Sequence, residues 1–305
     1  MVSRAMRSAP TEQHMLGLYF IHRYRFLTVR QFAAVTGLKE KSASEVLLRY
    51  ERRGFLDHFG NVGIRGYGKT PKVYFLKRAG YDLLAEESGI PYELLGDFKK
   101  AKVNTRWSPQ MYHRLATLDA LIALEVGVIA RPHIQVAETF IEYRQRKVNQ
   151  SWRPETSDYV ADARTPENRI IPDAGFILEN VESGKRALFF LEIDMGTERI
   201  TSKLGHGQRF SVHHKIRQYD RYLQSGMFQR TYAPWGEFTF FTLLFVTTTE
   251  TRLDNMRKAL SNLPPSLHGY YRFNTLDVVL ADFFNGAWRA RVIEDENRYR
   301  LIREE

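Results

Sequence analysis

Three carboxylates, Asp173, Glu192 and Asp194, stand at positions from which they could act together on one cation or substrate. Asp173 falls within an apolar segment at 169–178, and the other two end a second apolar segment at 186–194. Both segments predict β-strands. Acidic side chains are rarely buried in such surroundings without a partner, so their positions call for a chemical explanation.

The spacing of the two strands predicts where the carboxylates meet. A turn centred between Glu182 and Ser183 places Asp173 opposite Glu192. Cross-strand neighbours have Cβ atoms about 4.5–5.5 Å apart, close enough for two carboxylates to share a divalent cation. Asp194 lies two residues beyond Glu192 and therefore on the same face of the strand. Asp173, Glu192 and Asp194 are thus a candidate site for Mg²⁺ or Mn²⁺.

The order of the predicted elements resembles that of the PD-(D/E)xK nuclease superfamily over about residues 110–260. A long helix at 111–128 and a strand at 134–143 precede the acidic hairpin, and a helix at 213–223 and an apolar strand at 238–247 follow it. Three pairs of residues carry the resemblance: Pro172-Asp173 at the first motif, Glu192-x-Asp194 at the second, and Gln218-x-x-x-Tyr222, similar to a helix motif of one exonuclease-like branch.

This resemblance implies a catalytic set with one departure from the family pattern. The second motif of that family usually ends in a lysine that orients or activates the attacking water, and Asp194 stands there instead. Lys203 or Lys215 could supply the amine from elsewhere, and Gln218 shares a helix face with Lys215. A lysine amine within hydrogen-bond reach of the carboxylates would favour a nuclease. Two alternatives remain beside the nuclease. One is a metal site without robust cleavage, and the other is a structural role in which Glu192, Asp194 and Glu198 cap helices or pair with Arg199, Lys203 or Lys215.

The elements before this core predict a winged helix-turn-helix. Helical patterns run from about Thr11 to Phe26, from Val29 to Val35 and from Lys41 to Arg53, with Thr28 as an N-cap and Thr36-Gly37 as a stop. Strands follow at 55–59 and 72–76, and a helix at 77–87. The segment between the strands is rich in glycine and basic, as expected of a wing that contacts DNA.

Side chains of the third helix and the wing are the candidate DNA contacts. A recognition helix contacts base edges mainly through its N-terminal residues, which makes Ser42, Ser44 and Glu45 candidates for the groove. The cations around them are better placed for phosphates: Lys39, Lys41, Arg49, Arg52, Arg53, Arg65, Lys69 and Lys72. A solvated basic helix face is the alternative explanation of the arginines.

Composition supports an anionic partner. The chain of 305 residues carries a net charge of +10. Residues 1–105 contain 18 Lys/Arg and 10 Asp/Glu, so most of the excess positive charge belongs to the winged helix. With no cysteine, disulfides and thiolate metal sites are excluded. The sequence shows no membrane-length apolar run and no signal peptide, so we expect a cytoplasmic protein.

A basic winged helix followed by Pro172-Asp173-Ala174 and by Glu-Ile-Asp-Met-Gly-Thr-Glu at 192–198 resembles the replication-relaxation family. That family is associated with plasmids and other mobile elements. The resemblance implies DNA binding connected with replication, transfer or its control.

We therefore predict an α+β chain, with a winged helix at 1–100 and an α/β nuclease-like core at 106–305. The predicted function is control of replication, transfer or transcription of a mobile element, without a cofactor and with a degenerate core. The alternative is an endonuclease that depends on Mg²⁺ or Mn²⁺. The expected partner is double-stranded DNA, and a second copy of the chain and replication or transfer proteins are further candidates.

Overall fold

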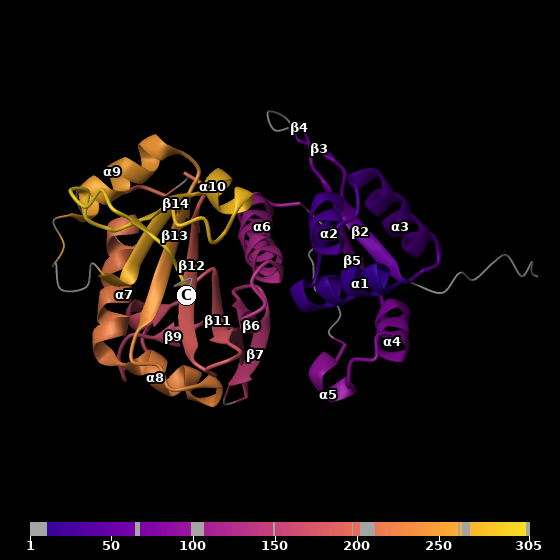
Figure 1. The fold of residues 1–305 in the computed structure, drawn as a ribbon, viewed down its shortest axis with the longest axis horizontal. Coiled ribbons are helices and arrows are strands. Elements are labelled where there is room, and N and C mark those ends of the chain that lie inside the picture. Colours follow the sequence, from indigo (N-terminus) through magenta and orange to yellow (C-terminus); the bar gives the residue numbers. More distant parts are fainter. Residues whose placement is uncertain are drawn as a thin grey trace, which may run out of the picture. The chain divides into compact units, whose positions relative to one another are not determined.

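The computed structural model describes residues 11–64, 68–98, 107–148, 150–196, 198–201, 211–261, 263 and 269–302. The chain divides into two compact units, residues 1–112 and 113–305. The division falls inside one helix, α6 (Pro109–Ile129). Figure 1 shows a mixed α+β architecture, as the sequence predicts. Among the described residues, no helix combines the length and the hydropathy needed to cross a membrane.

In the described residues of the first unit, the helices before α6 are α1 (Glu12–Tyr24), α2 (Val29–Thr36), α3 (Glu40–Arg52), α4 (Arg78–Glu87) and α5 (Tyr92–Leu95). The predicted cap of α2 is confirmed, because the Thr28 hydroxyl accepts from the Gln31 amide while the Gln31 side chain accepts from the Thr28 amide. Gly37 then ends the helix at φ 69°, a left-handed conformation that favours glycine. Three residues, 37–39, separate α2 from α3.

A three-stranded antiparallel sheet completes this unit, in the order β1-β5-β2. Its strands are β1 (Leu27–Thr28), β2 (Leu56–Gly60) and β5 (Lys72–Leu76). Between β2 and β5, a hairpin of β3 (Gly63–Ile64) and β4 (Gly68–Lys69) continues outward from the sheet. The predicted strands at 55–59 and 72–76 are confirmed, apart from a shift of one residue in the first.

The second unit is built on a seven-stranded mixed sheet in the order β16-β15-β14-β13-β12-β11-β6. The strands are β6 (Ile134–Ile141), β11 (Ala174–Asn180), β12 (Arg186–Asp194), β13 (Phe241–Thr247), β14 (Tyr271–Thr275), β15 (Trp288–Arg289) and β16 (Arg298–Tyr299). The three central strands β12, β13 and β14 are parallel, and the remaining pairs are antiparallel. A parallel central sheet is buried on both faces, which explains the continuous apolar runs of β12 and β13.

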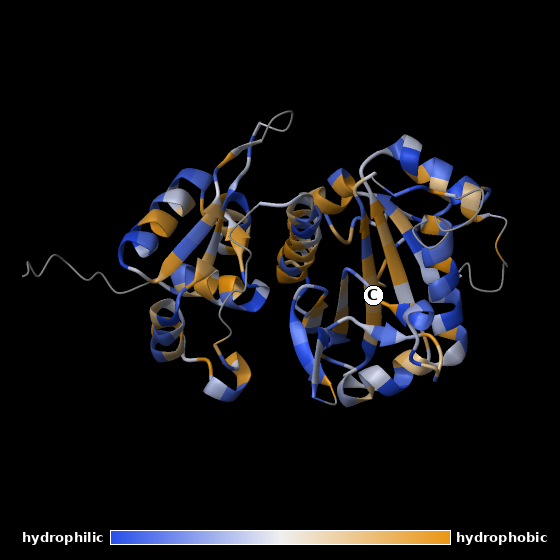
Figure 2. Ribbon diagram, turned by 180° about the vertical axis from the view of Figure 1, so that it is seen from behind, coloured by the Kyte–Doolittle hydropathy of each residue, from blue (hydrophilic) through white to orange (hydrophobic). Residues whose placement is uncertain are grey.

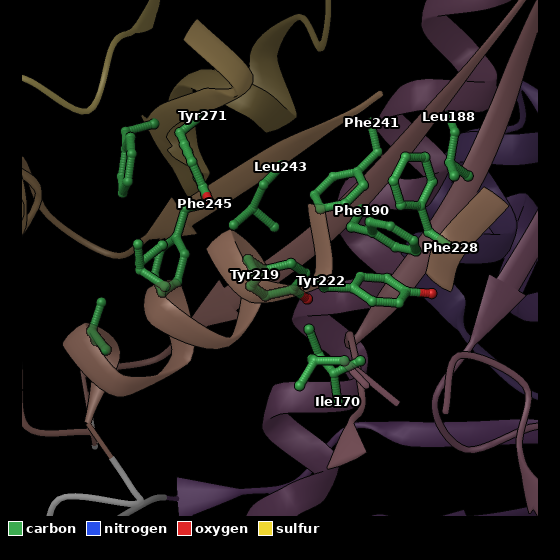
Figure 3. Packing of buried hydrophobic residues seen from close by; sticks show 14 of the residues in the cluster. Ile170, Leu188, Phe190, Tyr219, Tyr222, Phe228, Phe241, Leu243, Phe245 and Tyr271 are labelled. Carbon is green, nitrogen blue, oxygen red and sulfur yellow. The ribbon is translucent and has the colours of Figure 1, made fainter. Parts of the chain in front are cut away.

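Helices cover both faces of this sheet (Figure 1). Along one face lie α7 (Val212–Ser225), α8 (Met227–Tyr232) and α9 (Glu250–Leu260), and α6 and α10 (Leu276–Ala281) lie on the other. Figure 2 shows hydrophobic residues along the central strands and hydrophilic residues on the outer sides of α7 and α9. Figure 3 shows how Tyr219 and Tyr222 of α7 pack against Phe190 and Phe241 of the sheet.

One predicted strand is wrong. The segment 169–178 forms two separate strands, because β10 (Arg169–Ile170) pairs with β9 (Asp158–Tyr159) in a small sheet of its own. Pro172, which lacks a backbone N–H, lies between β10 and β11 and cannot donate to a continuous ladder. Asp173 consequently precedes β11 instead of lying within it.

Two polar strands were missed by the sequence analysis. A two-stranded hairpin of β7 (Gln145–Val148) and β8 (Ser151–Pro154) follows β6. It shows no alternation of apolar and polar residues that would predict strands. This hairpin, β9 and β10 together form an insertion between β6 and β11.

A buried ion pair ties the last strands to α7. Arg291 is fully buried, and its guanidinium lies 3.3 Å from the Asp220 carboxylate and 4.8 Å from the centre of the Tyr271 ring. The Tyr271 hydroxyl donates to the same carboxylate. A buried charge is tolerated when it is paired and hydrogen-bonded in this way.

Candidate functional site

The first candidate site is the acidic pair at the end of the β11–β12 hairpin. The predicted register is confirmed, since Ala174 pairs with Leu191, which brings the preceding Asp173 level with Glu192. Glu192 is only 1% exposed. Two carboxylates so placed repel each other unless cations lie beside them. The structure places a cation beside each.

Lys215 of α7 is the cation beside Glu192. Its Nζ donates to Oε2 of Glu192 at 2.9 Å and to Oε1 of Glu198 at 3.2 Å. Tyr219, one helical turn further along α7, donates its hydroxyl to Oε1 of Glu192 at 2.5 Å. The Glu192 side chain is therefore fixed by a lysine and a tyrosine from one helix face.

His113 of α6 is the cation beside Asp173. Its Nε2 lies 3.1 Å from Oδ2 of Asp173 and donates to the carbonyl of Ile193 at 2.8 Å. The amide of Ile193 also donates to Oδ2 of Asp173 at 2.8 Å. Asp173 is thus oriented by a histidine and by the strand that carries Glu192.

These contacts separate the pKa values of the two carboxyls. Burial raises the pKa of Glu192 to about 8, against the opposing charge of Lys215. Although burial acts in the same direction on Asp173, the hydrogen bond from His113 and the charge of Lys215 hold the pKa of Asp173 below its usual value. Burial lowers the pKa of His113, but the hydrogen bond to Asp173, the charges of Asp173 and Glu192 and the Ile193 carbonyl together raise the pKa to about 9. Pairs of acids with divergent pKa values are typical of functional sites.

Asp194 lies on the same face as Glu192 but has different partners. Arg252 of α9 binds both of its carboxylate oxygens, and Thr247 donates its hydroxyl to Oδ2 at 2.8 Å. The guanidinium of Arg252 also donates to the carbonyl of Glu198. The structure therefore does not bring Asp194 into the pair formed by Asp173 and Glu192.

The other predicted catalytic residues fall outside this pair. Gln218 is buried, but its amide donates to the carbonyl of Glu167 at 2.6 Å, and its oxygen accepts from Arg221. Lys203 lies outside the described residues. Of the two candidate amines, Lys215 is the one that the structure places within hydrogen-bond reach of a carboxylate.

The acidic pair offers two carboxylates to a metal ion. Within the described ranges, no group of three or more His, Cys, Asp or Glu side chains is arranged to hold one. An ion at this site would have Asp173 and Glu192 as protein ligands, with water or substrate completing its oxygen shell, as Mg²⁺ tolerates. The donor set therefore fits a hard divalent cation, provided that Lys215 yields one oxygen of Glu192.

A second, separate candidate site is the outer face of α3. Ala43, Val46, Leu47 and Tyr50 are buried and fix this helix against its unit. The opposite side is solvent-exposed and mostly basic: Lys39, Lys41, Ser42, Glu45, Arg49, Arg52 and Arg53. A shallow hollow on this side is lined by Glu45, Leu48 and the three arginines.

Most, but not all, predicted DNA contacts are on exposed surface. Ser44 is half-buried, and Lys69 of β4 is exposed. Lys72 is half-buried and already has partners within the protein. Its Nζ lies 3.2 Å from the Glu51 carboxylate and 5.3 Å from the centre of the Tyr74 ring. Arg65 lies outside the described residues.

Three residues of the site were not predicted as such. Tyr219 stands four residues after Lys215, so helical spacing alone could have placed it on the same face. No signal in the sequence marks His113 or Arg252, since both arrive from helices far from the hairpin in the chain.

The fold and the paired carboxylates can be compared with known proteins. The model of the replication-relaxation family matches residues 18–236, and the chain belongs to that family. The match includes α3, the acidic pair and Lys215. Membership connects the chain with the replication or transfer of plasmids and other mobile elements. Comparison with curated proteins found no match.

Proposed function

We propose that this protein binds duplex DNA through a winged helix formed by α1, α2, α3 and the β1-β5-β2 sheet. The exposed basic face of α3 is the observation that carries the proposal. A helix that follows a short turn after a preceding helix can enter the major groove, where its N-terminal side chains contact base edges. Ser42 and Glu45 occupy that position, and Arg49, Arg52 and Arg53 are placed for phosphates.

The β3–β4 hairpin is the proposed wing. It projects between β2 and β5 and carries the exposed Lys69. Together with family membership, this interface supports a role in controlling replication, transfer or transcription of a mobile element.

A binding measurement tests this proposal. Wild-type protein should shift a labelled duplex from its own mobile element, and the double variant Arg49→Gln/Arg52→Gln should bind at least tenfold more weakly. Arg78 and Asp82 form an exposed ion pair on α4, away from the α3 face, so Arg78→Gln is a matched control for loss of one positive charge. Equal affinity of the double variant and the wild type would overturn the α3 interface.

Metal-dependent DNA cleavage is a second candidate function, and the position of Lys215 favours it. Its ammonium contacts Glu192, while Asp194 occupies the place of the lysine expected from the nuclease superfamily. An amine supplied by α7 instead of by the strand could orient or activate the attacking water in the same way.

Five residues share the chemistry in this proposal. Asp173 and Glu192 would hold Mg²⁺ or Mn²⁺, which polarises a phosphodiester and lowers the pKa of bound water. Lys215 would place a positive charge next to the reacting phosphate, and Tyr219 would keep Glu192 in position by its hydrogen bond. His113 would hold Asp173 ionised.

A cleavage assay separates this candidate from DNA binding. Supercoiled plasmid, linear duplex and single strands are incubated with Mg²⁺ or Mn²⁺ and with wild-type protein, Asp173→Asn or Lys215→Ala. If the protein is a nuclease, the wild type should nick DNA, and both Asp173→Asn and Lys215→Ala should abolish the nicks. Lys185 is exposed, so Lys185→Ala is a control variant that should still nick DNA. If DNA stays intact with wild-type protein and either metal, the nuclease hypothesis is excluded and the proposal of a DNA-binding protein remains.

A further inference from the structure

The hairpin of β7 and β8 presents an exposed tryptophan on a basic ribbon. Trp152 is 61% exposed, although tryptophan is largely buried in most folds. It stands directly opposite Lys147 in the register of the two strands. The segment 144–154 contains four cations, Arg144, Arg146, Lys147 and Arg153, and no acidic residue.

The two faces of the ribbon differ. Side chains alternate between the faces of a strand, so Gln145, Lys147 and Trp152 share one face and are all exposed. On the opposite face, Arg146, Val148 and Arg153 are half-buried, and Arg146 donates to the carbonyl of Ser157. The hairpin is therefore anchored by one face and offers the other to a ligand.

One further cation, Arg164, lies at its base. Arg153 and Arg164 flank the Tyr159 ring, with guanidinium carbons 5.5 and 6.0 Å from its centre. The nearby carboxylate of Asp162 is paired with Arg230 at 3.1 Å, which reduces its opposition to an anion. The surroundings of Trp152 are thus suited to a polyanion.

We propose that the β7–β8 hairpin binds single-stranded nucleic acid, with a base stacked on Trp152 and a neighbouring phosphate on Lys147. Stacking on an aromatic ring combined with a basic track is how single strands are held without sequence preference. A duplex would first have to unstack a base step, which costs a few kcal/mol, whereas an unpaired strand offers its bases freely. This site is separate from the duplex interface proposed on α3.

The probe is an oligothymidylate of about 12 nucleotides, within the usual footprint of such sites. Binding is measured by anisotropy in EDTA, so that any metal-dependent cleavage cannot consume the probe. Trp152→Ala should weaken binding about 5- to 150-fold, the factor equivalent to about 1–3 kcal/mol per stacked base. Trp152→Phe should restore part of the loss, and Lys147→Gln should weaken binding and flatten its salt dependence.

Phe240 is the matched control, because it is also an exposed aromatic residue at 49% exposure. Phe240→Ala should leave oligothymidylate affinity unchanged. The probe should also quench tryptophan fluorescence in wild type and not in Trp152→Phe, a readout independent of affinity.

A duplex of equal length distinguishes this proposal from the α3 interface. Trp152→Ala should spare duplex affinity, and Arg49→Gln/Arg52→Gln should spare oligothymidylate affinity. The proposal is overturned if Trp152→Ala binds the oligothymidylate as wild type does, if it loses duplex and single strand equally, or if Phe240→Ala has the same effect.

Discussion

The Nζ of Lys215 lies 2.9 Å from a carboxylate oxygen of Glu192, a residue that is almost completely buried. The Lys215 side chain itself is 28% exposed, so the pair is open to solvent from one side only. Such a pair stabilises the fold less than its short distance suggests, because both ions lose hydration. The buried carboxyl of Glu192 is nevertheless held by Lys215 together with the hydroxyl of Tyr219.

Lys215→Met should destabilise the protein, because it leaves Glu192 buried next to Asp173 without its cation. Removing one partner of a fully buried pair costs about 3–5 kcal/mol, and the partial exposure of Lys215 reduces the expected loss to about 1–3 kcal/mol. Chemical denaturation measures it. Adding Glu192→Gln to Lys215→Met should recover most of the loss, and an unchanged denaturation midpoint in Lys215→Met would contradict the pair.

His113 should make stability depend on pH above neutrality. Its folded pKa is raised to about 9, above the value near 6.5 of an unfolded histidine, chiefly by its hydrogen bond to Asp173. The protonated form therefore stabilises the fold fully below pH 6.5, and this contribution is lost as the pH rises through about 9. Wild-type free energy of unfolding should decline across this window more steeply than that of His113→Gln. Parallel curves would show that His113 is not ionised next to Asp173.

Divalent cations should raise the melting temperature if Asp173 and Glu192 bind them. A ligand that binds only the folded state stabilises it by mass action. Mg²⁺ or Mn²⁺ should raise the midpoint in wild type and not in Asp173→Asn, and KCl at matched ionic strength serves as a control. A response that survives Asp173→Asn would place the cation elsewhere.

Duplex affinity should fall steeply with salt. Each phosphate neutralised by an arginine or lysine releases counterions, with a slope of about −0.9 in log–log form per contact. Arg49→Gln/Arg52→Gln should therefore reduce the slope by about 2. The slope is obtained from anisotropy titrations at several salt concentrations, and an affinity independent of salt would exclude the phosphate contacts.

Ser42 and Ser44 should affect sequence preference more than overall affinity. Both stand in the first two turns of α3, and a lost base contact typically costs about 1–3 kcal/mol. Binding-site selection with Ser42→Ala and Ser44→Ala tests this expectation. Ser44 is only half-exposed, so we expect the larger change from Ser42→Ala. If both variants select the wild-type site, other residues determine sequence preference.

Local signals in the sequence predicted the helices and the apolar strands well. The cap at Thr28, the stop at Gly37 and the turn at 182–185 are decided by a few neighbouring residues, and all three agree with the structure. The helix predicted at 111–128 is likewise observed, as α6 at Pro109–Ile129. Such features depend on hydrogen bonds within the segment itself.

Contacts between distant segments could not be predicted in the same way. The hairpin register brought Asp173 to Glu192, but the partner of each carboxylate comes from a helix remote in the chain. Arg252 follows Asp194 by 58 residues, and nothing near either residue encodes the pairing. The site was therefore predicted as three carboxylates, whereas tertiary packing divides them into an acidic pair with Lys215 and a separate ion pair at Asp194.

The burial of Arg291 sets a limit on how far the chain can be shortened. The family match ends at residue 236, but Asp220, within the match, has its charge balanced by Arg291 near the other end of the unit. A truncated protein that stops at the edge of the family match would also lose β13, the neighbour of β12 in the middle of the sheet. The segment that the family model matches is thus shorter than the compact unit that carries the sheet, and a fragment cut at residue 236 would expose the inner face of α7 to solvent.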